Sequence, residues 1–203
     1  MDSNELEELV RKSLDDFYQR RINKLSTLKL KDTLKKKNPY LFRAIGIQKA
    51  SEIVERLLRD YMSSSDEGIF GDAFFEPIVK IAGGGHVSPS EGVDVAIETD
   101  RVYKAIAVKS GPNIFNASQT RRMNDEFTSL RNRLLKLHKQ FDALLGHCYG
   151  RKSSEPTKKR IYRIRSGEAF WTELTGDPEF YLRLIRLMRD YPVQHRAVFE
   201  EEW

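Results

Sequence analysis

Two runs of alternating residues, separated by a short turn, constrain the fold of this chain more than any other feature. Apolar residues alternate with polar or small ones over residues 93–98 and again over residues 102–109. Alternation of this kind is typical of strands that bury one face. The intervening Thr99-Asp100-Arg101 is short enough for a tight turn. The pattern therefore predicts a β-hairpin.

An acid and a lysine fall on one face of this hairpin. If the turn centres on Asp100 and Arg101, Asp94 is paired with Ala107, and Lys109 lies diagonally beyond on the same face. In phosphodiester hydrolysis a carboxylate holds a divalent cation, and an ammonium group polarises the attacking water or the phosphate. The pair therefore predicts a metal-dependent site for phosphodiester cleavage.

The composition favours a globular protein of the cell interior. At 203 residues, one domain or one core with a helical elaboration is expected. Charged residues make up 32%, no apolar run approaches membrane-spanning length, and the acidic first residues differ from a signal peptide. The single Cys148 excludes an internal disulfide, and its neighbour His147 has no second pair at zinc-ligand spacing. We therefore expect a buried strand there, and a cytoplasmic protein without membrane contact.

Helical periodicity dominates the rest of the chain. A helix over about residues 67–82 is apolar on nearly all sides, which predicts a core helix, and Asp72 and Glu76 share one of its faces. Acids in such a setting need a cation, either a metal or a salt-bridge partner. The Ser63–Asp66 run is expected to end the preceding helix. The other predicted elements are helices over about residues 4–25, 29–37, 48–61, 116–141, 167–174, 178–190 and from 193, and strands over 143–149, 160–165 and briefly from 86.

Basic residues are clustered, although the net charge of +5 is mild. One cluster spans residues 29–37 and a second spans residues 151–165. Such clusters either contact nucleic-acid phosphates or form a solvated surface. The aromatic and arginine side chains of Tyr40–Arg43, expected in a loop, either touch DNA or anchor that loop to the core.

Several short sequence motifs, in a fixed order, resemble those of a known enzyme family. The motifs are Lys37-Asn38-Pro39-Tyr40-Leu41-Phe42-Arg43-Ala44, Phe70-Gly71-Asp72 with Glu76, Glu91-Gly92-Val93-Asp94, Val108-Lys109-Ser110-Gly111-Pro112-Asn113, Ser118-Gln119 and Cys148-Tyr149-Gly150-Arg151. The hairpin resembles the PD-(D/E)XK nuclease core. Together, the motifs resemble those of type II restriction endonucleases that cut interrupted GG-N-CC-type sites. The resemblance implies an α/β (α+β) fold, a restriction-endonuclease-like mixed sheet flanked by helices with N- and C-terminal helical elaborations. We assign residues 1–65 to an N-terminal helical region, for dimerisation or DNA wrapping, and residues 66–203 to the nuclease-like core with its C-terminal helices.

The resemblance also implies catalytic roles. Asp94 would be a metal ligand, Lys109 the base that orients water or phosphate, and Glu76 the helix carboxylate. The backbone carbonyl of Val108 would complete the shell of a magnesium ion, for which manganese would substitute. The middle acid of the motif falls on Ala107, so the helix acid replaces it, or Glu98 on the hairpin does.

Double-stranded DNA is the implied partner, and cleavage of both strands implies a two-fold homodimer. The candidate DNA-binding residues are Lys36, Lys37, Arg43, Asn113, Gln119, Arg121, Arg122 and Arg151. Two further hypotheses stay open. The first is a catalytically weak or inactive DNA-binding protein on the same scaffold, because Ala107 replaces the motif acid. The second is a helical interaction protein in which Asp94 and Lys109 form only a salt bridge.

Overall fold

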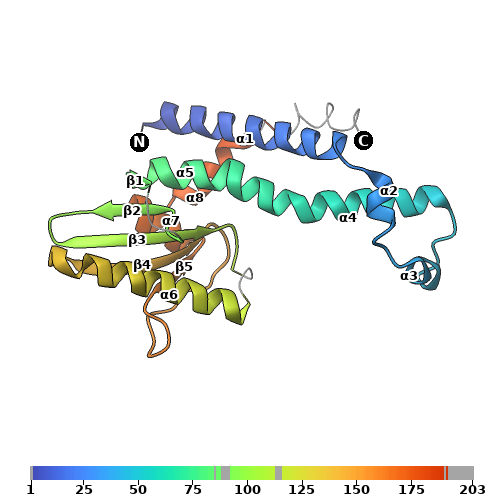
Figure 1. Cartoon of the computed structure of the whole chain (residues 1–203). Coiled ribbons are helices and arrows are strands. Elements are labelled where there is room, and N and C mark those ends of the chain that lie inside the picture. Colours follow the sequence, from blue (N-terminus) through green and yellow to red (C-terminus); the bar gives the residue numbers. More distant parts are fainter. Residues whose placement is uncertain (1, 85, 88–91, 113–115, 190, 192–203) are drawn as a thin grey trace.

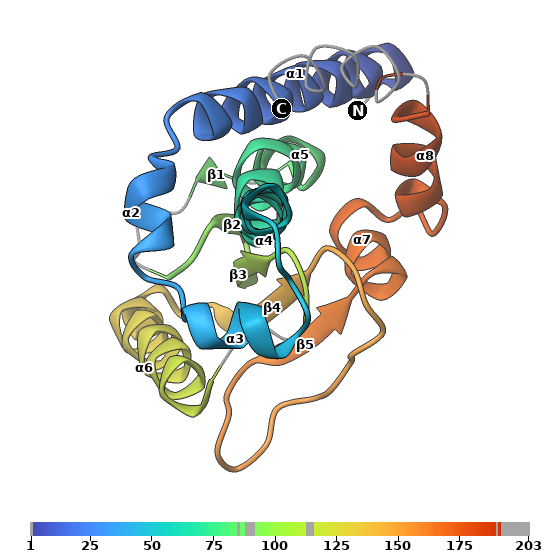
Figure 2. The ribbon, with the colours of Figure 1, turned by 90° about the vertical axis from the view of Figure 1, so that its right-hand side faces the viewer.

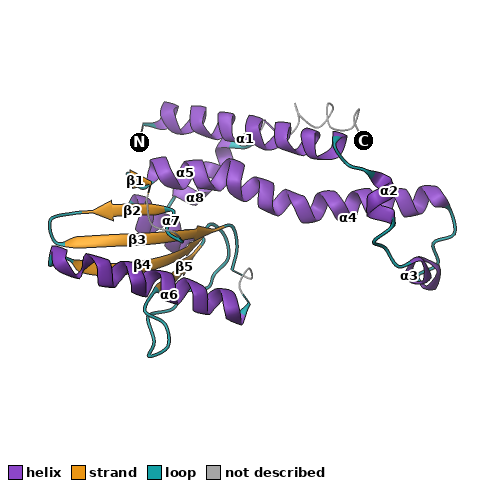
Figure 3. Ribbon diagram, viewed as in Figure 1, coloured by secondary structure: helices purple, strands orange, loops and turns teal. Residues whose placement is uncertain are grey.

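A mixed sheet with helices on both faces forms the centre of the computed structural model, which describes residues 2–84, 86–87, 92–112, 116–189 and 191 (Figure 1, Figure 3). Over the described residues, the sheet has five strands in the order β1-β2-β3-β4-β5. The first three strands are antiparallel, whereas β3, β4 and β5 run parallel to one another. The strands are β1 (His86–Val87), β2 (Val95–Glu98), β3 (Val102–Lys109), β4 (Gln140–His147) and β5 (Arg163–Ser166). The predicted α/β class is confirmed.

The predicted hairpin is present in the predicted register. Val95 is paired with Ile106, and the backbone N–H of Asp94 donates to the Ile106 carbonyl at 2.9 Å. Thr99 and Val102 close the turn through a 2.9 Å backbone hydrogen bond. The ladder pairs residues 95–98 with 103–106, so the predicted Asp94–Ala107 pair lies beyond its end.

Two apolar clusters cover the two faces of the sheet. One face packs against α6 (Ala117–Leu134), whose Met123, Phe127 and Leu130 are buried there. The other face packs against α5 (Glu76–Ala82) and α7 (Glu168–Thr175), with α8 (Phe180–Leu187) beside them. Figure 2 shows α6 on one side of the strands and α5 and α7 on the other. The strands between them are buried on both faces, as parallel strands normally are.

One long helical segment, interrupted by a π turn, approaches the end of the hairpin. It consists of α4 (Ala50–Phe70), the π turn η1 (Gly71–Phe75) and α5. The interruption follows from Pro77, which has no N–H to donate to the carbonyl of Ala73. Instead, the N–H of Glu76 bonds the Gly71 carbonyl, five residues earlier. Such π turns are often found at functional sites.

The prediction that Ser63–Asp66 ends a helix is wrong, because α4 continues through this run. The hydroxyl groups of Ser64 and Ser65 donate to the carbonyl of Tyr61, at 3.1 and 2.9 Å. Serine is compatible with a helix interior when its hydroxyl bonds to the preceding turn in this way. The proposed domain boundary between residues 65 and 66 therefore falls inside α4, and the division stays a prediction.

The N-terminal helices form one part of the core and one projecting arm. Helix α1 (Ser3–Ser26) buries Leu6, Val10 and Leu14 in the cluster that also contains residues of α5. In contrast, α2 (Leu30–Leu34) and α3 (Pro39–Ala44) bury no residue, and Figure 1 shows them at the end of α4 that points away from the sheet. We call residues 29–49 the arm.

The predicted loop at Tyr40–Arg43 is wrong, because these residues lie in α3. Asn38 caps this helix by accepting a hydrogen bond from the N–H of Tyr40 at 3.0 Å, and Pro39 occupies the first turn.

The predicted helix from 116 to 141 is too long. Helix α6 ends at Leu134 and is followed by a single 3-10 turn, η2 (Leu135–Leu137). His138 then has a positive φ of 52°, which stops the helix, and β4 begins two residues later. The helix predicted from about residue 193 lies outside the described residues. None of the described helices is long and apolar enough to cross a bilayer.

Candidate active site

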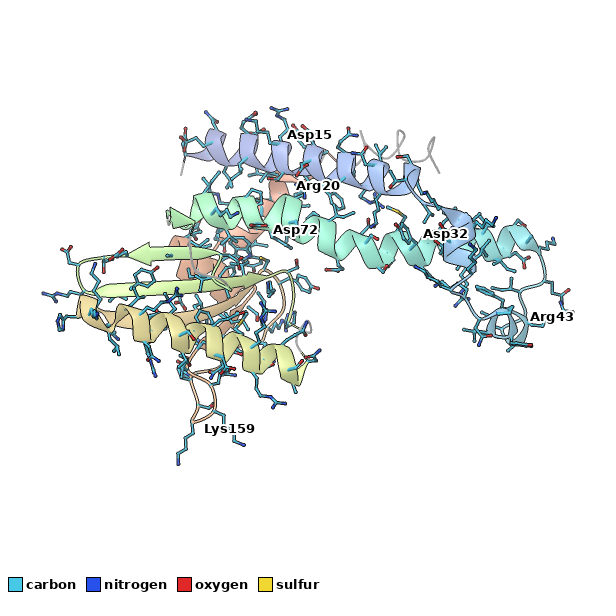
Figure 4. The ribbon with its side chains drawn as sticks, in the orientation of Figure 1. Asp15, Arg20, Asp32, Arg43, Asp72 and Lys159 are labelled. Atoms are coloured by element: carbon cyan, nitrogen blue, oxygen red, sulfur yellow. The ribbon has the colours of Figure 1, made fainter. Side chains whose placement is uncertain are left out.

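A small cavity of about 160 Å³ lies where the π turn meets the open end of the hairpin. Its walls come from two elements, the α4–η1–α5 segment and β3 with the residues next to β2. The lining residues are Gly68, Gly71, Asp72, Phe75, Glu76, Asp94, Val108, Lys109 and Ser110. Figure 4 labels Asp72 at the junction of α4 and α5, above the sheet. The structure therefore brings together Asp94, Lys109, Val108 and Glu76, which the sequence placed in one site.

Asp94 is held by the backbone of β3. Its Oδ2 accepts a 2.7 Å hydrogen bond from the N–H of Val108, at a position where β2 has not yet begun. The Asp94 carboxylate thus accepts the Val108 N–H just beyond the end of the β2–β3 ladder, where a backbone carbonyl would otherwise accept it. In a strand, the N–H and C=O of one residue point toward the same neighbour. The carbonyl of Val108 is therefore directed toward the Asp94 side of β3.

Lys109 is the last residue of β3, and its backbone is fixed by β4. The N–H of Cys148 donates to the Lys109 carbonyl at 3.0 Å. The lysine side chain, which is half-buried, lines the same cavity as Asp94 and the helix acids. In a cavity of this composition, the carboxylates would hold a cation and the ammonium group would contact a phosphate.

The helix acids approach the hairpin because Gly71 lies directly against Ser110. A Cβ at position 71 would overlap the Ser110 Oγ. Absence of a side chain at Gly71 lets the helix come this close, and the π turn then directs Asp72 and Glu76 into the cavity. Glu76 also forms an ion pair with Lys80 at 2.6 Å, so the salt-bridge alternative for this acid is realised in the structure.

The oxygen donors fit a magnesium ion that keeps most of its water shell. Within the described part of the chain, no three His, Cys, Asp or Glu side chains form a ready-made metal-binding group. Magnesium usually needs only one or two protein carboxylates. Asp94, the Val108 carbonyl and an acid from the helix meet that requirement at one cavity.

Besides Glu76, two acids could replace the missing motif acid, namely Glu98 and Asp72, and only Asp72 lines the cavity. Glu98 lies at the turn end of β2, is paired with Lys139 at 2.6 Å and is not among the cavity-lining residues, so its assignment as a replacement ligand is wrong. Asp72 lines the cavity beside Glu76. Ala107 itself is fully buried in the apolar cluster under α6. The sequence signal for the π turn that presents Asp72 is Pro77 inside a helical pattern.

His147 and Cys148 are buried as predicted, at the end of β4. The Nδ1 of His147 lies 2.9 Å from the Ser166 hydroxyl, and burial lowers the pKa of this imidazole to about 4. Burial, with a smaller contribution from Asp94, raises the pKa of the Cys148 thiol. Both side chains are therefore neutral at physiological pH, and they fill the interior between the sheet and its helices.

Five of the candidate DNA-binding residues lie on two separate parts of the molecule. Lys36, Lys37 and Arg43 are exposed on the arm, and Figure 4 labels Arg43 at its far end. Arg121 and Arg122 are exposed on the first turns of α6, where Arg122 pairs with Glu126 at 2.8 Å.

Three further candidates have other positions. Gln119 caps α6, because its Oε1 accepts a 2.9 Å hydrogen bond from the N–H of Asn116. Arg151 is exposed in the loop after β4. Asn113 lies outside the described residues.

Part of the second basic cluster is internal rather than free for phosphate. Arg163 donates to Asp142 at 2.7 Å and to Glu173 at 2.6 Å, and these hydrogen bonds raise the pKa of its guanidinium group. Hydrogen bonds from Arg163 and Lys104 outweigh burial and lower the pKa of Glu173. This network joins α7 to β4 and β5.

A sequence model described as the type II restriction endonuclease EcoO109I family matches residues 4–195 of the chain. The match covers the arm, the cavity-lining residues and α8 alike. No curated protein sequence matches the chain.

Proposed function

This chain belongs to the EcoO109I family of type II restriction endonucleases, and we propose that it hydrolyses DNA in a magnesium-dependent reaction at the cavity of Asp94 and Lys109. Membership of the family supports DNA binding and an endonuclease activity of the restriction-modification type. The observation that carries the metal-dependent mechanism is that acids from the helix and from the hairpin line one cavity with a lysine.

The residues of the chain divide the chemistry between them. Asp94, fixed by the Val108 N–H, would hold the metal with the Val108 carbonyl and one helix acid, Glu76 or Asp72. A bound magnesium ion supplies charge that stabilises the scissile phosphate and lowers the pKa of a water molecule. The Lys109 ammonium group would donate hydrogen bonds to the phosphate and orient the attacking water.

Substrate binding would involve two exposed basic surfaces, one on the arm and one on the first turns of α6. The arm carries the exposed Lys36, Lys37 and Arg43, and the first turns of α6 carry the exposed Arg121 and Arg122. Phosphate contacts from both surfaces would hold a duplex against the cavity. Because one cavity cuts one strand, the proposed enzyme acts as a two-fold homodimer.

The experiment is cleavage of supercoiled plasmid DNA with magnesium, with manganese and with a chelator. Lys109→Ala is expected to reduce the rate by about a hundredfold or more, because an electrostatic donor at the reacting phosphate is lost. Lys139→Ala is the matched control, since Lys139 pairs with Glu98 at the turn end of β2. Asp72→Asn and Glu76→Gln identify which helix acid holds the metal.

The alternative function is DNA binding without cleavage, and the apolar Ala107 at the motif position favours it. Wild-type protein that binds DNA in a salt-dependent manner, but does not cut with either metal, would establish this alternative. A protein without any salt-dependent DNA affinity would instead be an interaction protein.

A further inference from the structure

The cavity is assembled from a helical segment and a hairpin that share no backbone hydrogen-bond ladder. The α4–η1–α5 segment contributes Asp72 and Glu76, and the hairpin contributes Asp94 and Lys109. Figure 1 shows the C-terminal end of α4 beside the end of β3. Since the acids must lie at a set distance from the lysine, some side-chain contact has to fix the helix relative to the strand end.

Tyr149 is attached to the strand end by its own backbone. Its N–H donates to the carbonyl of Ser110 at 3.2 Å, directly after the Cys148–Lys109 hydrogen bond of 3.0 Å. Its ring lies against the backbone of Gly111, where an added Cβ would be 2.8 Å from the Tyr149 Cε2. Tyr149 therefore fixes the two residues that follow Lys109.

The same side chain reaches the helix. Its hydroxyl donates to Oε2 of Glu67 at 3.4 Å, although the two residues are 82 positions apart. Glu67 immediately precedes Gly68, the first cavity-lining residue of α4. Burial, and then the charge of Glu67, raises the pKa of the Tyr149 phenol, so the hydroxyl keeps its proton at neutral pH.

We propose that Tyr149 is a positioning residue of the endonuclease, which sets the separation between the helix acids and the Asp94–Lys109 pair. The inference rests on the proposed function of the cavity. Tyr149 does not line the cavity itself. Its ring holds the end of β3 and its hydroxyl holds α4, so that one side chain joins the two walls of the cavity.

The test uses the full chain and three variants. Tyr149→Phe removes the hydroxyl and keeps the ring, Glu67→Gln keeps a hydrogen-bond acceptor, and Tyr103→Phe removes a phenol hydroxyl from the other end of β3. Manganese binding without DNA is measured by calorimetry. Loss of one hydrogen bond is expected to weaken manganese binding about three- to tenfold in Tyr149→Phe. The melting temperature and the metal-free affinity for DNA are expected to stay at wild-type values, and the cleavage rate at saturating DNA falls.

Hydrogen–deuterium exchange of residues 68–76, in the absence of metal, tests the same contact without the proposed function. Exchange is expected to be faster in Tyr149→Phe than in wild type, Glu67→Gln or Tyr103→Phe. Equal exchange in all four proteins overturns the positioning role, whatever their activity. If the wild type binds manganese and Tyr149→Phe binds it with equal affinity, the positioning role is overturned as well. A wild type that neither binds manganese nor cuts DNA, with faster exchange in Tyr149→Phe, overturns only the proposed function and supports the contact.

Discussion

Substitution of Gly71 by alanine tests what the close approach of helix and hairpin contributes to stability and cleavage. A Cβ at this position would overlap the Ser110 Oγ but would lie 3.8 Å from the Ser110 Cβ, which is an ordinary van der Waals distance. Alanine gains about 0.5–1 kcal/mol over glycine in helical backbone. Overpacking typically costs about 1–3 kcal/mol. We therefore expect Gly71→Ala to destabilise the protein by about 1 kcal/mol and to reduce plasmid cleavage.

A double-mutant cycle isolates the overlap. In the Ser110→Ala background the oxygen that a Cβ at Gly71 would meet is absent, so Gly71→Ala is expected to stabilise the protein by about 0.5–1 kcal/mol. The coupling energy between the two sites should then be about 1–3 kcal/mol. Gly68→Ala, for which nothing lies within 4 Å of the added Cβ, is the matched control and should be stabilising in both backgrounds.

Urea denaturation of the four members of the cycle measures these free energies, and plasmid cleavage measures the functional effect. Additive effects of Gly71→Ala and Ser110→Ala, within about 0.5 kcal/mol, would refute the contact. Cleavage by Gly71→Ala at the wild-type rate would show that the helix acids need no such approach to the hairpin.

Three further predictions follow from single positions. Gly146→Ala should lower the free energy of unfolding by about 1–3 kcal/mol, because the new Cβ would lie 2.5 Å from the Phe170 Cδ2 in a buried layer; an unchanged urea midpoint would contradict this packing. The folded-state pKa of His147 is lowered to about 4, so stability present above pH 6.5 should be lost as pH falls toward 4, by up to about 3 kcal/mol. His147→Gln should remove most of this acid sensitivity and His138→Gln, on the surface, should not. Lys36→Ala should reduce the slope of log affinity for DNA against log salt by about 1, and an unchanged slope would exclude a phosphate contact there.

The hairpin and the core helix were predictable because their signals are local. Alternation over residues 93–109 and the short turn between the two runs predicted both strands and their pairing. The errors have equally local causes. Serine hydroxyl groups that bond to the preceding turn let α4 pass through Ser63–Asp66. His138, with its positive φ, ends the 3-10 turn that follows α6, where apolar periodicity predicted that the helix continues.

The site was predictable in its residues but not in its construction. Asp94 and Lys109 are identified by type and spacing, Glu76 by the resemblance to a known family, and all three line one cavity. The pairing of Glu76 with Lys80, the presence of Asp72 and the exclusion of Glu98 depend on side-chain contacts that the alternation pattern does not contain.

By itself, the sequence determined the hairpin, the pairing of its strands and the positions of Asp94 and Lys109 at its open end, because period-two burial and turn length act over neighbouring residues. The mixed sheet was implied by the resemblance to a known family. Only the tertiary structure decided how closely the helix acids approach that lysine. This distance depends on contacts between residues far apart in the chain: Gly71 against Ser110, and Tyr149 between Gly111 and Glu67. Packing of this kind is set by the shapes of side chains that meet only after the chain has folded.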